Sequence, residues 1–238
     1  IGLAKIGVVS ALINHNLTGE GLAHCVGLAD AKYLIAGHKQ AKALRETKPL
    51  FSPDLKMWSL AGEEATPLRP LLNDAVISRP SRSHRAGRTA NDLFLYVYTS
   101  GTTGLPKGAR LTNVRTRNMM KYFIIPTGVT AKDRVYNCLP LYHGTGGIAA
   151  VGQVFLSGAA MLLKEKFSTS NFWRDVRAGD ATMIVYIGEL CRYLLNAPDS
   201  PNDKKHHVRG GFGNGLRPDV WEKFLNRFGI PKLVEFYG

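Results

Sequence analysis

An apolar segment followed at once by a loop of hydroxyl and glycine residues constrains the fold more than any other part of the sequence. Residues 93–97 read Leu-Phe-Leu-Tyr-Val, a run that is typical of a buried strand. Residues 98–108 then read Tyr-Thr-Ser-Gly-Thr-Thr-Gly-Leu-Pro-Lys-Gly. Glycines allow sharp turns, loop N–H groups and hydroxyls can converge on phosphate oxygens, and Lys107 adds a mobile positive charge. The sequence therefore predicts a phosphate-binding loop after a strand.

This loop differs from the P-loop of the common nucleotide triphosphatases, which requires Gly-x-x-x-x-Gly-Lys-Ser/Thr. Counted from Gly101, Pro106 stands at the second glycine position, and Gly108 follows the lysine. The alternative interpretation is an ordinary Ser/Thr/Gly turn between two strands.

Length and composition indicate a globular chain. The sequence has 238 residues, 45% of them hydrophobic, enough for one large or two modest domains. It contains no apolar run long enough to span a bilayer, and no signal peptide follows Ile1, so we expect an internal piece of a longer protein. The three cysteines, Cys25, Cys138 and Cys191, lack metal-binding spacing and are expected to be reduced thiols in a cytosol-facing protein.

The formal charge of +13 suits an anionic partner such as a nucleotide, CoA, a membrane surface or a nucleic acid. Four arginines fall within residues 79–88, inside a Pro-, Ser- and Arg-rich stretch that predicts a surface linker over residues 63–92. The arginines favour a solvated linker, with contact to anionic lipid or nucleic acid as the alternative. No aromatic residues alternate with them, which argues against nucleic-acid binding.

Strand-like and helix-like segments alternate along the chain, which predicts an α/β fold. Residues 7–13 and 32–36 read as strands separated by a helix from Thr18 to about Asp30, which suggests a parallel crossover. Further strands are expected at residues 57–60, 135–139, 159–163, 181–186 and 233–237, with helices between most of them.

Candidate site residues stand where predicted strands end, because ligands of open α/β sheets bind outside the carboxyl ends of the strands. Tyr142 and His143 follow one strand, and the histidine is either a neutral donor or a gate beside a substrate carboxylate. Gly188, at the end of another strand, is interpreted as leaving room for a ligand. A predicted glycine bend at residues 210–216 and Tyr237 are suitable walls for a flat purine. Each of these signals alone is weak, and a lone Tyr-His pair is more often structural.

Several of these stretches together resemble known enzymes. The loop at residues 98–108 resembles the signature of the acyl-adenylate-forming superfamily. Other stretches are similar to the fatty acid transport protein family, also called very-long-chain acyl-CoA synthetases. These are Gly-Leu-Ala-Lys-Ile-Gly at residues 2–7, Leu-Pro-Leu-Tyr-His at 139–143, Tyr-Ile-Gly-Glu-Leu-Cys-Arg-Tyr-Leu-Leu-Asn at 186–196, Gly-Asn-Gly-Leu-Arg at 213–217 and Glu-Phe-Tyr-Gly at 235–238. The similarity covers nearly the whole chain except roughly residues 38–90.

The resemblance implies that residues 1–238 form part of the large N-terminal domain of an acyl-adenylate-forming enzyme, with mostly parallel sheets flanked by helices. It implies a two-step reaction in which a fatty carboxylate attacks Mg-ATP to give acyl-AMP and pyrophosphate, and CoA then displaces AMP. The implied substrates are a long- or very-long-chain fatty acid, ATP with Mg²⁺, and CoA. The full protein would couple this ligase activity to fatty acid uptake at the endoplasmic reticulum, peroxisome or plasma membrane, with its catalytic domain facing the cytosol.

The same match assigns roles to individual residues. The implied ATP- and AMP-binding residues are Thr99, Ser100, Gly101, Thr102, Thr103, Gly104, Lys107, Gly213, Asn214, Glu235, Phe236, Tyr237 and Gly238. Tyr142, His143, Tyr186, Ile187 and Gly188 would border the acyl substrate. Lys107 and His143 are the implied catalytic residues, and no metal ligand is expected within the chain.

The sequence departs from the family pattern in two respects. Gly108 stands where this family often has alanine. The threonine, glutamate and ribose-binding aspartate that follow in the family lie outside these residues, as do the N-terminal membrane segment and the C-terminal lid with its lysine. We therefore expect the 238-residue chain alone to lack ligase activity. Alternative functions are another acyl-adenylate enzyme, such as a bile-acid or medium-chain CoA ligase or an amino-acid adenylation domain, and a non-enzymatic fatty acid carrier.

Overall fold

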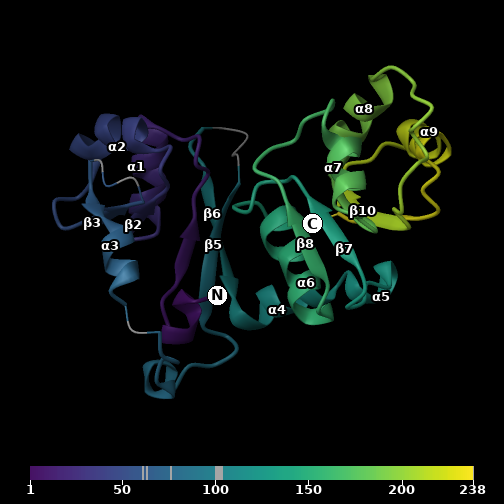
Figure 1. Ribbon diagram of the computed structural model, residues 1–238. Helices are drawn as coiled ribbons and strands as arrows, with labels where there is room; N and C mark the ends of the chain where they lie inside the picture. Colours follow the sequence, from purple (N-terminus) through teal and green to yellow (C-terminus); the bar gives the residue numbers. More distant parts are fainter. Residues whose placement is uncertain (61, 63, 76, 100–103, 238) are drawn as a thin grey trace. The chain divides into compact units, whose positions relative to one another are not determined.

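The computed structural model describes residues 1–60, 62, 64–75, 77–99 and 104–237 (Figure 1). The chain divides into two compact units, Ile1–Val114 and Arg115–Gly238, each of which is described by itself. Both units combine sheets with helices, as predicted for an α/β fold.

The first unit contains two small sheets. One is parallel throughout and has the order β2-β3-β4, formed by Tyr33–Ala36, Lys56–Ser59 and Thr66–Pro67. The other has the order β1-β5-β6, formed by Ser10–Leu12, Leu93–Thr99 and Lys107–Thr112. In this second sheet β1 runs parallel to β5, whereas β5 and β6 are antiparallel.

The predicted parallel crossover within residues 7–36 is wrong. The two strands and the intervening helix α1 (Gly19–Leu28) form, but β1 pairs with β5 and β2 pairs with β3. The two strands therefore belong to different sheets. Apolar periodicity identifies a strand but says nothing about its hydrogen-bonding partner, and β1 takes a partner more than eighty residues away.

Helix α1 packs on the first unit's small core through Leu22 and Val26. Its first N–H group has an acceptor from another helix, because Gly19 N donates a hydrogen bond to the buried hydroxyl of Thr47 at 2.8 Å. Thr18, where this helix was expected to begin, occupies the N-cap position without a side-chain hydrogen bond. Thr47 ends helix α2 (Ala41–Thr47), so this contact ties the two helices together.

The predicted surface linker at residues 63–92 contains short regular elements. They are strand β4, helix α3 (Leu68–Asn73) and the 3-10 helix η3 (Arg82–Arg85). The described residues between 71 and 91 are all exposed, which agrees with their polar and basic composition. A second 3-10 helix, η1 (Leu3–Ile6), packs against η3, and a third, η2 (Lys48–Leu50), follows α2.

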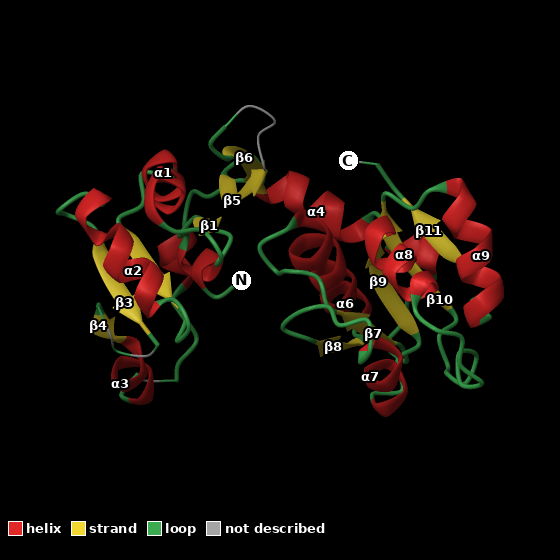
Figure 2. Ribbon diagram, turned by 90° about the horizontal axis from the view of Figure 1, so that it is seen from above, coloured by secondary structure: helices red, strands yellow, loops and turns green. Residues whose placement is uncertain are grey.

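The second unit is built on one five-stranded parallel sheet with the order β11-β10-β9-β7-β8 (Figure 2). The strands are β7 (Arg134–Asn137), β8 (Ala160–Leu163), β9 (Met183–Ile187), β10 (Gly210–Asn214) and β11 (Leu233–Glu235). The central strand β9 is buried along almost its whole length, as expected for a strand covered on both faces.

Helices connect these parallel strands and cover the sheet. The π-helix η4 (Gly144–Ala150) and α6 (Val151–Ser157) join β7 to β8. Helices α7 (Phe172–Ala178), α8 (Gly188–Asn196) and α9 (Pro218–Phe228) make the next three crossovers. Right-handed crossovers would place α7, α8 and α9 on one face and α6 on the other. The ring of Trp173 on α7 packs against Phe228 on α9 at 4.5 Å, consistent with a shared face.

Aromatic and aliphatic side chains at helical spacing form the core beneath these helices. Val220, Phe224 and Phe228 are four residues apart on α9 and are all buried. Pro218 begins this helix and Gly229 ends it in a left-handed conformation, which are the positions that proline and glycine favour at helix ends. Helix α4 (Asn113–Lys121) approaches α6 closely, because a Cβ at Gly152 would lie 2.3 Å from Met120. A short helix, α5 (Ile124–Thr127), follows it.

Besides β4, two strands differ from the sequence prediction. Residues 210–214 were predicted to form a glycine bend, but they form β10, buried between β9 and β11. Glycine fits there because a Cβ at Gly213 would lie 2.1 Å from the carbonyl oxygen of Tyr186. Residues 107 and 108 were assigned to the phosphate loop, but together with residues 109–112 they form β6. The β5–β6 pairing sets this loop apart from the strand–loop–helix arrangement of a P-loop.

Candidate functional site

The predicted phosphate loop connects two antiparallel strands. Thr99, the last residue of β5, pairs directly with Lys107, the first residue of β6, and both are exposed. Gly104, between them, has a φ of 142°, which favours glycine. The predicted contacts at Ser100, Gly101, Thr102 and Thr103 lie outside the described residues. The ends of the loop are thus fixed by a strand ladder, and the lysine stands where the ladder begins.

Helix α1 forms hydrogen bonds with residues at both ends of this loop. His24 Nε2 lies 2.9 Å from the carbonyl oxygen of Pro106, and the Tyr98 hydroxyl donates to the carbonyl oxygen of Cys25 at 2.6 Å. Burial raises the pKa of Tyr98 to about 12, so this hydroxyl remains a donor at neutral pH. The contact of His24 with the loop spans 82 positions, and no local pattern in the sequence indicates it.

The remaining predicted residues gather at the carboxyl edge of the five-stranded sheet. From β7 the chain moves outward to β8, then returns past β7 to β9 and continues to β10 and β11. The order reverses between β7 and β9, and ligands of such sheets bind outside the strand ends at this switch point. His143 follows β7, Gly188 follows β9, and Asn214 and Glu235 end β10 and β11. The topology therefore brings four separate sequence motifs to one edge.

Thr145 connects two of these motifs. Its side-chain oxygen donates to Asn214 Oδ1 at 3.1 Å, and its backbone N–H donates to His143 Nδ1 at 3.4 Å. Thr145 is buried within the π-helix η4, an unusual element that often occurs at functional sites. Since Nδ1 accepts a hydrogen bond, the neutral His143 ring carries its proton on Nε2, and this exposed residue can donate from that atom. Sequence analysis missed Thr145 because its partner lies on another strand.

Glu235 connects two further motifs. Its Oε2 accepts a hydrogen bond from the Tyr186 hydroxyl at 2.8 Å, and its Oε1 accepts one from Leu216 N at 2.9 Å. The same tyrosine hydroxyl lies 3.1 Å from the carbonyl oxygen of Val234. Tyr186 is completely buried. The structure thus places this predicted acyl-site residue inside the sheet, and gives both carboxylate oxygens of the predicted nucleotide-binding Glu235 protein partners.

The interpretation that Gly188 leaves room for a ligand is wrong. A Cβ at this position would lie 1.7 Å from the carbonyl oxygen of Gly215. The turn after β10 therefore occupies the space that a side chain at Gly188 would need. Gly215 itself has a φ of 77°, a conformation that favours glycine. The neighbouring Ile187, also predicted to border the acyl site, is partly exposed at the end of β9.

The two aromatic residues that follow β11, Phe236 and Tyr237, differ in their exposure to solvent. Phe236 N donates to the carbonyl oxygen of Gly213 at 3.0 Å, and its ring centroid lies 4.5 Å from that of Phe123. Tyr237 is fully exposed, so its ring is accessible for stacking. Tyr142, on the loop after β7, is partly buried. The predicted contact at Gly238 lies outside the described residues.

The described residues contain no group of three or more His, Cys, Asp or Glu side chains placed to hold a metal ion. Cys25, Cys138 and Cys191 are free and buried. Burial raises the pKa of all three thiols, that of Cys138 to about 12, which argues against nucleophilic roles at neutral pH. Among the residues that the structure describes, no helix is both long enough and apolar enough to cross a membrane.

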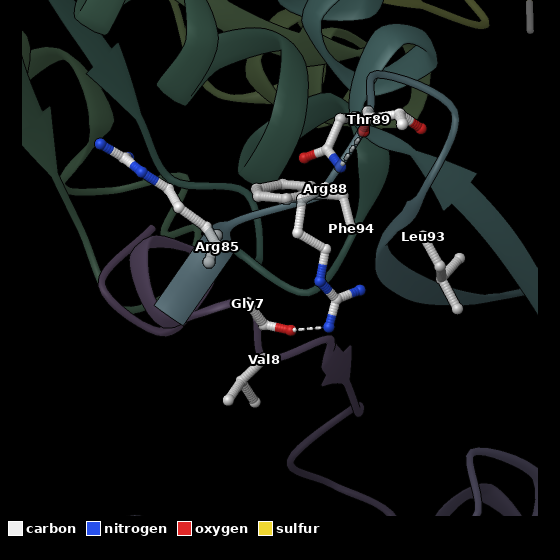
Figure 3. A pocket seen from close by; sticks show the side chains of 9 residues that line it. Gly7, Val8, Arg85, Arg88, Thr89, Leu93 and Phe94 are labelled. Atoms are coloured by element: carbon white, nitrogen blue, oxygen red, sulfur yellow. Dashed lines mark hydrogen bonds between the residues drawn. The ribbon is translucent and has the colours of Figure 1, made fainter. Parts of the chain in front are cut away.

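A cavity of about 270 Å³ lies in the first unit, between η1, the segment after η3 and the start of β5 (Figure 3). Arg88 borders it and donates from Nη2 to the carbonyl oxygen of Gly7 at 2.7 Å. Arg85 also borders the cavity, and its guanidinium extends away from Gly7 (Figure 3). None of the predicted site residues that the structure describes lines this cavity.

A parallel sheet with a topological switch point makes this an α/β protein of the class whose ligands bind at the carboxyl ends of the strands. The family model described as "AMP-binding enzyme" matches residues 1–238, and the chain belongs to this family.

Relatives of known name agree with this assignment. The chain is 42% identical over 243 residues to long-chain fatty acid transport protein 1 of Mus musculus, covering 100% of this chain and 38% of the relative. It is 38% identical over 241 residues to the medium/long-chain-fatty-acid–CoA ligase FadD6 of Mycobacterium tuberculosis, covering 100% of this chain and 39% of the relative. The chain thus spans well under half the length of these relatives.

Solved structures show the same fold. A benzoate CoA ligase from Burkholderia xenovorans superposes with a TM-score of 0.82 at 19% sequence identity, covering 98% of this chain and 46% of the other. The N-terminal domain of FACL13 from Mycobacterium tuberculosis superposes with a TM-score of 0.82 at 17% identity, covering 100% of this chain and 58% of the other. These neighbours confirm the predicted α/β fold class.

Proposed function

We propose that the full-length protein activates long- or very-long-chain fatty acids to acyl-CoA through an acyl-AMP intermediate. The observation that carries the proposal is the match of the whole chain, at about 40% identity, to fatty acid transport proteins and to a fatty-acid–CoA ligase. The gathering of His143, Asn214 and Glu235 at one sheet edge supports it. The reaction would consume ATP and CoA, and residues 1–238 would form part of the adenylation domain.

In this proposal the loop between β5 and β6 binds the phosphates of ATP. Lys107 stands at the start of β6, exposed and opposite Thr99, so its flexible side chain can follow the phosphate charge as it develops. Contacts of this kind accelerate the reaction where they are stronger in the transition state than in the ground state. Magnesium would enter as part of the Mg-ATP substrate.

The adenine would bind beside β10 and the segment after β11. Asn214 Oδ1 already accepts a hydrogen bond from Thr145, which leaves its NH₂ group available to a ring nitrogen of the base. Tyr237 offers an exposed ring for stacking. On the other side of the switch point, His143 would donate from Nε2 to the carboxylate of the fatty acid as it attacks the α-phosphate. Tyr142 and Ile187 would border the same acyl group.

The test is pyrophosphate exchange by the full-length protein with a panel of carboxylic acids of increasing chain length. We expect exchange with long-chain fatty acids, and a loss of at least a hundredfold in kcat/KM for Lys107→Ala, in the range of a lost transition-state contact. Lys223→Ala removes an exposed lysine from α9 and should behave as wild type. Exchange restricted to bile acids, medium-chain acids or amino acids would support another adenylating ligase. Unchanged exchange and fatty acid uptake in Lys107→Ala would refute the assigned role.

The 238-residue chain alone provides a second test. We expect it to bind ATP or an acyl-AMP analogue in a calorimeter, more weakly as Lys107→Ala, without forming acyl-CoA. Robust acyl-CoA formation by this chain would contradict the proposal that further segments complete the active site. The absence of binding by a folded chain would count against the assignment of the loop.

Membrane association belongs to the same proposal and places the catalytic domain on the cytosolic side. It is supported by the net charge of +13, by the exposed arginines of residues 79–88 and by the transport function in the relatives' names. Co-sedimentation of the full-length protein with vesicles containing phosphatidylserine should fall when Arg82 and Arg85 are both replaced by glutamine. Equal binding to neutral vesicles would argue against a contribution from these charges.

A further inference from the structure

Glu235 ends β11 but directs its carboxylate back toward two earlier motifs. One oxygen accepts a hydrogen bond from Tyr186 on β9 and the other accepts one from the backbone N–H of Leu216. The carboxylate thus bridges a strand and a turn that approach it from separate crossovers, 49 and 19 positions away. Both distances, 2.8 and 2.9 Å, are those of well-formed hydrogen bonds.

The turn that Glu235 holds carries a predicted adenine contact. Leu216 lies two residues after Asn214, and Gly215 between them has the left-handed φ of 77°. The backbone of this turn also packs closely on Gly188, because a Cβ at Gly188 would lie 1.7 Å from the carbonyl oxygen of Gly215. The turn is therefore fixed at two points, by backbone packing at Gly215 and by the carboxylate at Leu216.

We propose that Glu235 is a positioning residue that fixes the turn after β10, and hence Asn214, for adenine binding, and does not itself contact the nucleotide. This inference rests on the proposed function and changes the role that motif resemblance gives to Glu235. Tyr186 takes part in the same arrangement, because its hydroxyl donates a hydrogen bond that orients the carboxylate of Glu235. We name the three groups, Tyr186 hydroxyl, Glu235 carboxylate and Leu216 N–H, the Glu235 clamp.

The chemistry of the three groups suits a fixed support. A carboxylate is acceptor-only when ionised, so each of its oxygens can serve one of the two donors. The pKa of Tyr186 lies well above its usual value, because burial and the hydrogen bond to Glu235 both disfavour the phenolate. Its hydroxyl is therefore a permanent donor at physiological pH. Tyr186 is also fully buried, which leaves it no route to a substrate without rearrangement of the sheet.

The first experiment is hydrogen exchange of the full-length protein without substrate. We expect Glu235→Ala to accelerate exchange of the Leu216 amide and of its neighbours in residues 213–217 by at least about tenfold, the effect of losing one well-formed hydrogen bond. Tyr186→Phe should accelerate exchange less, since the Leu216 bond remains. Glu222→Gln, on the exposed surface of α9, should leave this exchange unchanged. Unchanged exchange in Glu235→Ala would overturn the proposal.

The second experiment measures pyrophosphate exchange by the same variants. Positioning of Asn214 predicts a rise in KM for ATP of about tenfold in Glu235→Ala, with KM for the fatty acid unchanged. A double-mutant cycle separates support from direct contact. Tyr186→Phe combined with Glu235→Ala should be no worse than Glu235→Ala alone. Additive losses, or a lost ATP affinity in Glu235→Ala with unchanged amide exchange, would mean that Glu235 binds the nucleotide directly.

Conservative variants keep these tests decisive if Glu235→Ala fails to fold. Glu235→Gln retains the shape and one acceptor, so it should raise KM for ATP while the second unit remains folded. A Glu235→Gln protein with wild-type exchange at Leu216 and wild-type KM for ATP would overturn the clamp. If wild-type protein shows no pyrophosphate exchange, the proposed function fails, while the substrate-free amide exchange still reports on the Glu235 clamp.

Discussion

Asp133 holds the edge of the large sheet opposite to the candidate site, and its removal should destabilise the second unit. The residue precedes β7 and its side chain is 5% exposed. It accepts hydrogen bonds from Arg209 Nε and Nη2 at 2.8 and 2.7 Å, from the Thr182 hydroxyl at 2.7 Å and from Thr130 N at 2.8 Å. Since Thr182 precedes β9 and Arg209 precedes β10, one carboxylate joins three neighbouring strands.

The perturbation is Asp133→Asn, which keeps the shape, removes the charge and turns an NH₂ group toward hydrogen-bond donors. Breaking a buried ion pair costs about 3–5 kcal/mol. The Arg209 side chain is 43% exposed, so solvent screens part of the pair, and we expect a loss of about 2–3 kcal/mol. For a protein of this size that corresponds to a fall of about 4–12 °C in the midpoint. Thermal denaturation of the purified protein, with hydrogen exchange of β7, β9 and β10, measures the loss.

The pH dependence provides the sharper check. Burial alone would raise the pKa of Asp133, but hydrogen bonds from Arg209, Thr130 and Thr182 outweigh it and hold the pKa well below its usual range. A carboxyl whose folded pKa is depressed stabilises the fold above its unfolded pKa of about 4 and loses that contribution as the pH falls through the folded value. The stability difference between wild type and Asp133→Asn should thus be full at pH 7 and shrink below about pH 4.

Two further results would refute this reasoning. A midpoint of Asp133→Asn within 1 °C of wild type at pH 7 would mean that the carboxylate does not join the strands. A constant difference down to pH 2 would mean that charge is not the cause. Asp219→Asn is the matched control, because Asp219 pairs with Arg217 on the exposed surface, and its midpoint should stay near that of wild type. KM for ATP should be unchanged in Asp133→Asn, since the substitution lies at the far edge of the sheet.

Three other substitutions test close contacts and hydrogen bonds of the structure. Gly188→Ala forces a methyl group against the carbonyl of Gly215 and should cost about 2–3 kcal/mol in urea denaturation, whereas Gly27→Ala, with open space around its Cβ, should be neutral or stabilising. Thr145→Val removes the hydroxyl that holds Asn214 and should cost about 1 kcal/mol and weaken ATP binding in a calorimeter, with Thr145→Ser close to wild type. Arg227→Lys loses a fork of hydrogen bonds to three backbone carbonyls and should lower the midpoint by several degrees in thermal denaturation, about 1–2 kcal/mol.

Most strands and helices could be predicted from the sequence, because apolar runs and end signals are local. Pro218 and Gly229 mark the two ends of α9 within one or two residues. Strand partners could not be predicted. Residues 10–12 form a strand as expected, but the strand pairs with β5. The three strands of the β2-β3-β4 sheet come between β1 and β5 in the sequence. Strand β10 was not predicted because its glycines suggested a turn. Glycine is needed there because a side chain would collide with a neighbouring carbonyl oxygen.

The location of the candidate site at strand ends was also predictable, because parallel strands present their carboxyl ends at one edge. The sequence could not indicate which residue of each motif faces outward. Thr145, the His24–Pro106 contact and the Glu235 clamp all depend on partners between 2 and 82 positions away, and the long-range ones leave no local pattern. A motif match treats its residues alike, whereas the fold gives each a separate environment.

The three described residues of the last motif show this difference most clearly. Glu235, Phe236 and Tyr237 are consecutive and were assigned together to nucleotide binding. Glu235 is engaged by Tyr186 and Leu216, and Phe236 packs against Phe123 and bonds to the backbone of β10. Both therefore support the sheet edge, and Tyr237 alone of the three has a fully exposed ring. Since stacking requires a free ring face, we expect adenine affinity to depend on an aromatic ring at Tyr237, retained in Tyr237→Phe and lost in Tyr237→Ala.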